Sequence, residues 1–128
     1  MFPRFKAELL RKTIDVTLAG ETGIKAYAFD TGTYAITSVD QFYSDVSTGV
    51  VGAGVTMTNV TVSDDGEVDW DDFTFPSLSG ATVEGIVYTL QHTALSQDLL
   101  VYYDDDANFT PVGENVNVTF TGAYVFKL

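Results

Sequence analysis

Along most of the chain, apolar and polar residues alternate with a period of two, which is the pattern of β-strands that bury one face. The alternation begins at Thr13 and is interrupted roughly every ten residues by turns that contain glycine, proline or aspartate. This pattern predicts about eight strands in a single all-β domain over residues 13–128, a β-sandwich of jelly-roll or immunoglobulin-like type.

Two of these strands carry the clearest signals. Residues 82–91 are apolar on both faces, so this strand is expected to be central and buried, with residues 99–103 paired beside it. Residues 115–120 alternate strictly instead, which predicts one face turned toward the core and one toward solvent. The inward-facing residues of that segment are Val116, Val118 and Phe120.

The alternation shifts by one residue at Thr58–Asn59 and again at Asp71–Asp72. Because such a shift turns every following side chain to the opposite face, a β-bulge is predicted at each position. Between them, Asp64–Asp65–Gly66 is typical of the tight turn of a β-hairpin.

Three segments of the domain are predicted to lie outside strands. A short helical turn is expected at residues 39–45, because Ser38 and Gln41 have the spacing of a capping box. Residues 47–54 are rich in glycine and small side chains and are interpreted as a long exposed loop. Residues 76–80 are expected to form a turn.

The first twelve residues follow a helical period and predict an amphipathic arm, residues 1–12. This arm contains four of the six basic residues of a chain whose formal net charge is −12. It either covers an edge of its own sheet or docks on a neighbouring subunit or shell. The residues expected to make such a contact are Phe2, Arg4, Phe5, Lys6, Leu9, Arg11 and Lys12.

Composition narrows the classes of function. A chain of 128 residues with 45% hydrophobic residues is long enough to bury one core. The acidic surface repels phosphate backbones and therefore disfavours a nucleic-acid partner. No apolar run reaches the roughly 18 residues that a membrane helix needs, and the first residues lack the features of a secretory signal. The absence of cysteine excludes disulfides and thiolate metal sites.

Catalytic chemistry finds little support in the residues. His92 is the only histidine, and a general base also needs a nucleophile and an orienting group near it. Carboxylates gather at residues 64–72 and 104–106, but neither cluster has the spacing of a calcium-binding loop. A solvated acidic face is therefore favoured over a metal site, and we expect no enzyme activity and no cofactor.

The order of the segments resembles a known family. The sequence contains, in order, IDVTL, IKAYAFD, FYSDV, GVTMTNVTV, VDWDDFTFPSLSG, GIVYTL and VNVTFTGAYVFKL. From Phe5 to Leu128 this order resembles that of small β-rich structural proteins of tailed phages. Two stretches depart from the family pattern, the polar connection at residues 91–97 and the acidic run at residues 104–106.

The resemblance implies a capsid decoration protein, made in the host cytoplasm and located on the surface of the virion. Its implied partners are the major capsid protein or other virion proteins, and pairing of exposed β-edges would allow a homotrimer. A neck, head–tail connector or tail-associated protein is an alternative. A receptor- or carbohydrate-binding module is another, suggested by the aromatic residues Tyr34, Tyr43, Trp70, Tyr102 and Tyr103.

Overall fold

The computed structural model describes residues 2, 23–91 and 98–127. The expected arm helix therefore lies outside the described residues, except for Phe2, and so does His92. The other proposed contact residues that fall outside them are Arg4, Phe5, Lys6, Leu9, Arg11 and Lys12.

The largest sheet has four antiparallel strands in the order β2-β1-β6-β7. Every residue of β6 is buried, which confirms the prediction of a central strand with the segment after it as its neighbour. The bounds of these strands are β1 Ile24–Phe29, β2 Val50–Thr56, β6 Gly85–Leu90 and β7 Leu99–Asp104.

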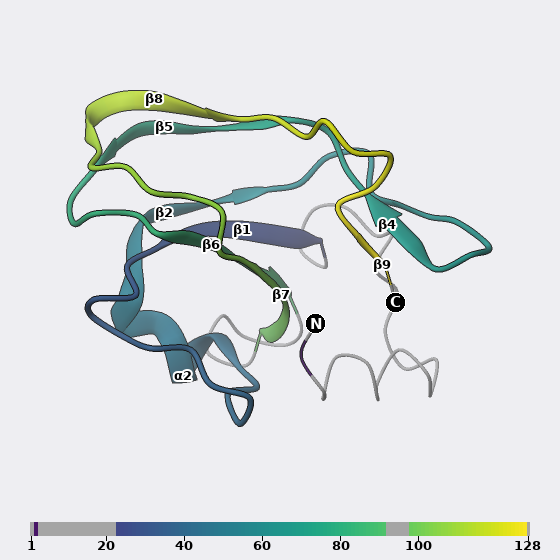
Figure 1. Cartoon of the computed structure of the whole chain (residues 1–128), viewed down its shortest axis with the longest axis horizontal. Helices are drawn as coiled ribbons and strands as arrows, with labels where there is room; N and C mark the ends of the chain where they lie inside the picture. Colours follow the sequence, from purple (N-terminus) through teal and green to yellow (C-terminus); the bar gives the residue numbers. More distant parts are fainter. Residues whose placement is uncertain (1, 3–22, 92–97, 128) are drawn as a thin grey trace.

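A second layer lies across one face of this main sheet. Figure 1 shows the antiparallel pair β5 (Phe73–Ser79) and β8 (Val112–Val118) above β1, β2 and β6, with β4 (Glu67–Asp69) and β9 (Phe126–Lys127) at one end. A small third sheet has the order β3-β4-β9, with bounds Thr61–Val62, Glu67–Asp69 and Phe126–Lys127. The described chain is thus an all-β, sandwich-like domain, as predicted.

The main core fills the space between the layers and is rich in aromatic rings. The Trp70 ring lies 4.8 Å from that of Tyr88, 5.9 Å from that of Phe126 and 6.3 Å from that of Phe120, measured between centroids. Val116, Val118 and Phe120 are half-buried and pack against this core, which confirms their predicted inward direction.

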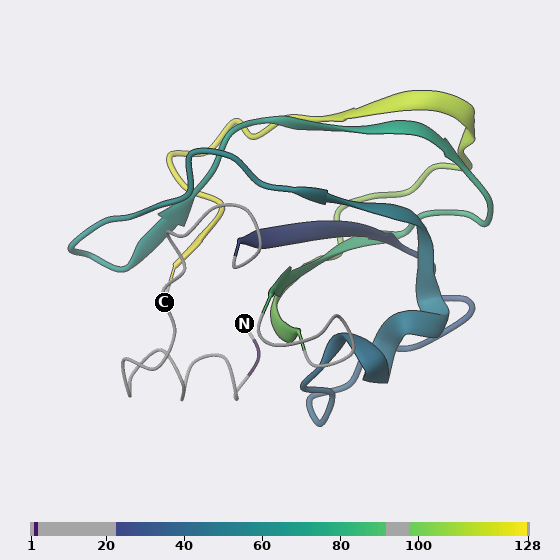
Figure 2. The same ribbon diagram turned by 180° about the vertical axis from the view of Figure 1, so that it is seen from behind.

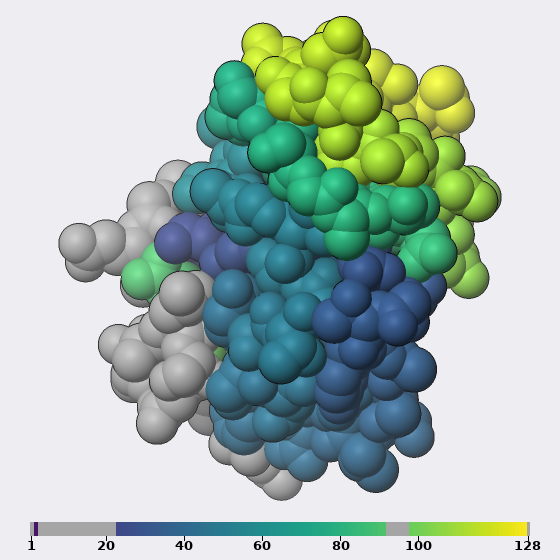
Figure 3. All heavy atoms as spheres, turned by 90° about the vertical axis from the view of Figure 1, so that its left-hand side faces the viewer, coloured from purple at the N-terminus to yellow at the C-terminus, as the bar shows by residue number. Residues whose placement is uncertain are grey.

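The opposite face of the main sheet is also covered. Residues 30–49, which include the helical turn α2 (Tyr43–Val46) and the 3-10 turn η2 (Ser47–Gly49), lie below it in Figures 1 and 2. A second apolar cluster forms there from Phe2, Phe29, Val46, Val87 and Leu100. Figure 3 shows the resulting stack from the side, with β8 at the top and the segment after β1 at the bottom.

The expectation of an exposed loop at residues 47–54 was wrong, because this segment forms η2 and most of β2. Two of its glycines make room for rings of the neighbouring strand β1. A Cβ atom on Gly49 would overlap the ring of Phe29, and one on Gly54 would overlap the ring of Tyr27. Gly49 and Gly54 therefore reflect close packing against rings, while the exposure predicted for residues 52–54 is confirmed.

The two expected β-bulges were also wrong, because each shift in the alternation marks a change of sheet. Strand β2 ends at Thr56, Asn59 adopts a left-handed conformation with φ of 53°, and the chain continues as β3. The chain likewise leaves β4 and enters β5 across Asp71–Asp72. The predicted hairpin between these points is confirmed by the pairing of β3 with β4.

The turn expected at residues 76–80 is instead part of β5, which continues to Ser79. A register shift between Phe75 and Leu78 accommodates Pro76, which cannot donate a hydrogen bond to the ladder.

The helical turn expected at residues 39–45 is displaced and begins at Tyr43. Its N-cap residue is Phe42, and the Asp45 Oδ2 atom reaches back to accept hydrogen bonds from the amides of residues 41 and 42 at 2.9 Å.

Candidate functional site

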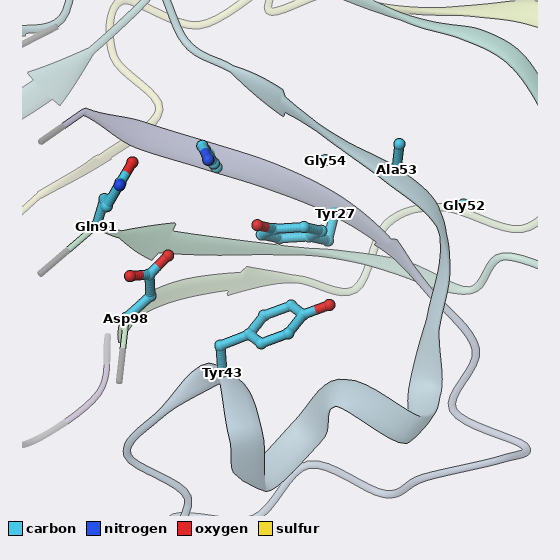
Figure 4. Close-up of a pocket in the computed structure, with 8 residues that line it drawn as sticks. Tyr27, Tyr43, Gly52, Ala53, Gly54, Gln91 and Asp98 are labelled. Atoms are coloured by element: carbon cyan, nitrogen blue, oxygen red, sulfur yellow. The ribbon is translucent and has the colours of Figure 1, made fainter. Parts of the chain in front are cut away.

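A polar pocket of about 280 Å³ lies on the face of the main sheet that α2 covers (Figure 4). Strand β1 contributes two side chains, β2 a glycine-rich wall, and α2 a tyrosine, while the ends of β6 and β7 close the pocket. The lining residues are Lys25, Tyr27, Tyr43, Gly52, Ala53, Gly54, Gln91 and Asp98.

Tyr27 lies at the centre of the pocket. Alternation along β1 places Ala26 and Ala28 in the main core and turns Tyr27 to the opposite face. Its ring packs against that of Tyr43 with 4.9 Å between centroids and 46° between planes. Figure 4 shows the Tyr27 hydroxyl at the same end of the pocket as Gln91 and the carboxylate of Asp98.

Asp98 is fully buried and joins two elements of the site. Its backbone oxygen accepts a hydrogen bond from the Tyr43 amide at 2.8 Å, which ties the start of α2 to the start of β7. This bond fixes the backbone of Asp98 at the edge of the pocket, and Figure 4 shows its carboxylate to one side of the two tyrosine rings.

The electrostatics of the pocket keep both tyrosines neutral. Burial raises the pKa of Tyr27 to about 12, with further contributions from Tyr43 and Asp98 and a smaller opposing one from Thr89. Burial and then Asp98 also raise the pKa of Tyr43. Protonated hydroxyls donate and accept hydrogen bonds but are poor bases at neutral pH, so these two side chains suit binding of a small polar group better than proton abstraction.

The raised pKa of Tyr27 predicts a loss of stability in alkaline solution. Below pH 10 the residue is protonated in both states, whereas between pH 10 and about 12 the unfolded chain releases the proton more readily than the folded one. The free energy of unfolding is therefore expected to fall across this window, as measured by urea denaturation at several pH values.

Tyr27→Phe is the matched variant for this measurement, because it removes the titrating hydroxyl and keeps the ring. Its unfolding free energy is expected to fall less steeply between pH 10 and 12 than that of the wild type. Identical slopes would show that Tyr27 does not titrate differently in the folded protein.

The structure places one predicted contact residue of the arm. Phe2 is 7% exposed, packs in the second apolar cluster of its own chain, and donates its amide to the Val101 oxygen at 3.2 Å. This side chain thus holds the N-terminal end against β7.

The acidic residues predicted to form a solvated face also have internal partners. The Asp71 carboxylate accepts hydrogen bonds from Thr58 Oγ1 at 3.1 Å and Asn59 Nδ2 at 2.6 Å. Asp72 accepts one from the Phe120 amide at 2.9 Å. Among the described residues, no three acidic, histidine or cysteine side chains are grouped so that they could hold a metal ion.

Of the aromatic residues that suggested carbohydrate binding, Trp70 is 4% exposed and packs in the main core, which counts against that role for its ring. Tyr43 does line the pocket. Tyr27 and Asp98 were not singled out from the sequence. The available signal was Gly54, since a glycine within a strand indicates a close approach, here by the ring of Tyr27.

Comparison with protein-family models and with curated proteins finds no match for this chain. Across the described residues, no helix has the length and apolar character needed to cross a bilayer. What the protein does must therefore be inferred from its own residues.

Proposed function

We propose that the chain is a non-enzymatic structural protein of a tailed-phage virion, and specifically a capsid decoration protein that binds the major capsid protein. The observation that supports this proposal best is how the chain uses its carboxylates. Several of them accept hydrogen bonds from backbone amides, hydroxyls and a side-chain amide of their own chain, and so brace loops and strands.

Two loops illustrate this use. Glu84 accepts hydrogen bonds from the amide and the hydroxyl of Thr31, across 53 residues of sequence. Asp40 accepts three from Tyr34 and Thr37. Bonds of this kind stiffen a small body, and a stiff body loses little entropy when it attaches to a surface.

Attachment to a shell also favours a small rigid domain for a second reason. Each copy makes a contact of modest area, and a repeating lattice offers the same contact many times. The acidic charge of the chain supplies long-range attraction to basic surfaces and keeps free copies soluble.

The proposal predicts a high copy number in purified particles. Quantitative mass spectrometry of the particles, with labelled peptides of this chain and of the major shell protein, is expected to give comparable copy numbers for the two. A few copies per particle would instead assign the chain to the neck, the head–tail connector or the tail.

Complete absence from the particle would contradict a virion role. In that case the pocket around Tyr27 and Tyr43 would become the main feature to explain, and a receptor- or carbohydrate-binding module would be the favoured alternative.

A further inference from the structure

A second hollow, of about 430 Å³, lies between the segment that follows β7 and strand β8. Half-buried Phe109, Val116, Val118 and Phe120 give it an apolar floor, and Asp104 and Asp106 stand on one rim. We call it the β8 groove. Figure 1 shows the chain after β7 crossing in front of the main sheet, below β5 and β8, before it turns up into β8.

Both walls of the β8 groove are held by hydrogen bonds. On one side, Phe109 and Val83 exchange two backbone hydrogen bonds, at 2.8 and 3.0 Å. On the other side, Asn117 Oδ1 accepts a hydrogen bond from Thr74 Oγ1 at 2.7 Å, and Asn115 Oδ1 accepts one from the Ser77 amide at 3.0 Å. The outward side chains of β8 are thus tied to β5, and the groove is preformed.

Strand β8 also offers its backbone. Within the described structure it pairs with β5 along one edge, and no described strand pairs with the other. An edge strand presents N–H and C=O groups to which an extended segment can add. Val112, the first residue of the strand, is 75% exposed, so an apolar side chain already lies at the surface there.

The charge of the groove selects the partner. Asp104 and Asp106 are on the rim, Asp105 lies between them in sequence, and no basic residue is among the lining residues. The described lysines lie elsewhere: Lys127 is 3.5 Å from Glu67, and Lys25 is in the polar pocket. A negative rim around an apolar floor is complementary to a cationic segment with apolar side chains.

We propose that the β8 groove binds an extended segment of the capsid shell protein in which apolar side chains are flanked by lysine or arginine. The segment adds to the free edge of β8, places its apolar side chains over Val116 and Val118, and directs its cations to Asp104 and Asp106. This inference rests on the proposed virion role and names the surface that carries it out.

The test uses the full chain and particles of the phage that encodes it, prepared without this protein. Bound copies are measured by mass spectrometry over a dilution series. Asp104→Asn/Asp106→Asn removes the rim charge and keeps the Asp104 oxygen that accepts the Asp106 amide. It is expected to weaken binding about tenfold or more, and to reduce the sensitivity of binding to salt.

The matched control is Asp64→Asn/Asp65→Asn, which removes the same charge from the exposed β3–β4 hairpin and is expected to change affinity by less than about twofold. Val118→Thr tests the apolar floor, with Val62→Thr on β3 as its control. Circular dichroism of each variant is compared with that of the wild type to exclude misfolding.

The outcomes separate the two proposals. If the wild type binds and the groove variants bind equally well, the groove inference is wrong and the virion role stands. If the wild type does not bind at all, both are wrong. If the groove variants lose self-association but keep particle binding, the occupant is a second copy of the chain, and the partner assigned here is wrong.

Discussion

Replacing Trp70 with alanine is expected to lower the free energy of unfolding by about 3–5 kcal/mol. Its ring contacts Tyr88 of the main sheet, Phe126 of β9 and Phe120 after β8, so one side chain joins three parts of the core. Truncation leaves a cavity that the paired strands around it cannot close. Because Trp70 is the only tryptophan, urea unfolding must be followed by far-ultraviolet circular dichroism.

Two controls define what the loss means. Trp70→Phe keeps an aromatic ring and, because the buried Trp70 Nε1 atom has no hydrogen-bond partner in the described structure, removes no such bond. Trp70→Phe is therefore expected to lower the free energy of unfolding clearly less than Trp70→Ala does. Tyr124→Ala, at an exposed position, is expected to change stability by less than about 0.5 kcal/mol. A Trp70→Ala variant as stable as the wild type would contradict the described core.

Replacing Asp40 with alanine is expected to lower the free energy of unfolding by about 2–3 kcal/mol. The Asp40 carboxylate is buried and accepts hydrogen bonds from the Tyr34 hydroxyl at 2.9 Å, the Thr37 amide at 2.7 Å and the Thr37 hydroxyl at 3.2 Å. Alanine leaves these donors without their acceptor. Chemical denaturation gives the loss, and faster amide exchange over residues 30–42 would locate it.

Asp40→Asn is the matched variant, because it keeps the shape and one acceptor oxygen but not the charge. Its free energy of unfolding is expected to lie between that of the wild type and that of Asp40→Ala. Asp64→Ala, in an exposed hairpin turn, is expected to have almost no effect. Equal small losses for Asp40→Ala and Asp64→Ala would show that the Asp40 network does not contribute to stability.

The elements that could be predicted from the sequence are those whose signals are local. Apolar residues on both faces of residues 85–90 predicted a central strand, since only burial on two sides accommodates them. Asp64–Asp65–Gly66 predicted a hairpin, because Gly66 adopts the positive φ, here 79°, that the turn requires. Strict alternation predicted the inward face of β8.

The predictions that were wrong concern residues whose environment is made by distant parts of the chain. Gly49 and Gly54 have the composition of a loop, yet their role is set by the rings of Phe29 and Tyr27 on the adjacent strand. The shifts at Thr58–Asn59 and Asp71–Asp72 have the same sequence signature as bulges. Only the pairing partners show that the chain changes sheet there.

Neither candidate site could be assembled from the sequence. The polar pocket combines Tyr27, Tyr43 and Asp98, and the β8 groove combines the acidic run at the end of β7 with Val116 and Val118. The sequence shows each of these residues but not which residues lie next to it in space. Strand order, rather than distance along the sequence, decides which side chains share a surface.

The sequence by itself determined the all-β class, the central strand, the hairpin and the acidic charge, because each depends on local periodicity, turn chemistry or composition. Only the tertiary structure decided that a glycine-rich segment is a strand, that two shifts are changes of sheet, and that a neutral tyrosine pocket and an acidic groove exist. These features depend on contacts between residues far apart in the chain, and local patterns carry no information about which distant segments will meet.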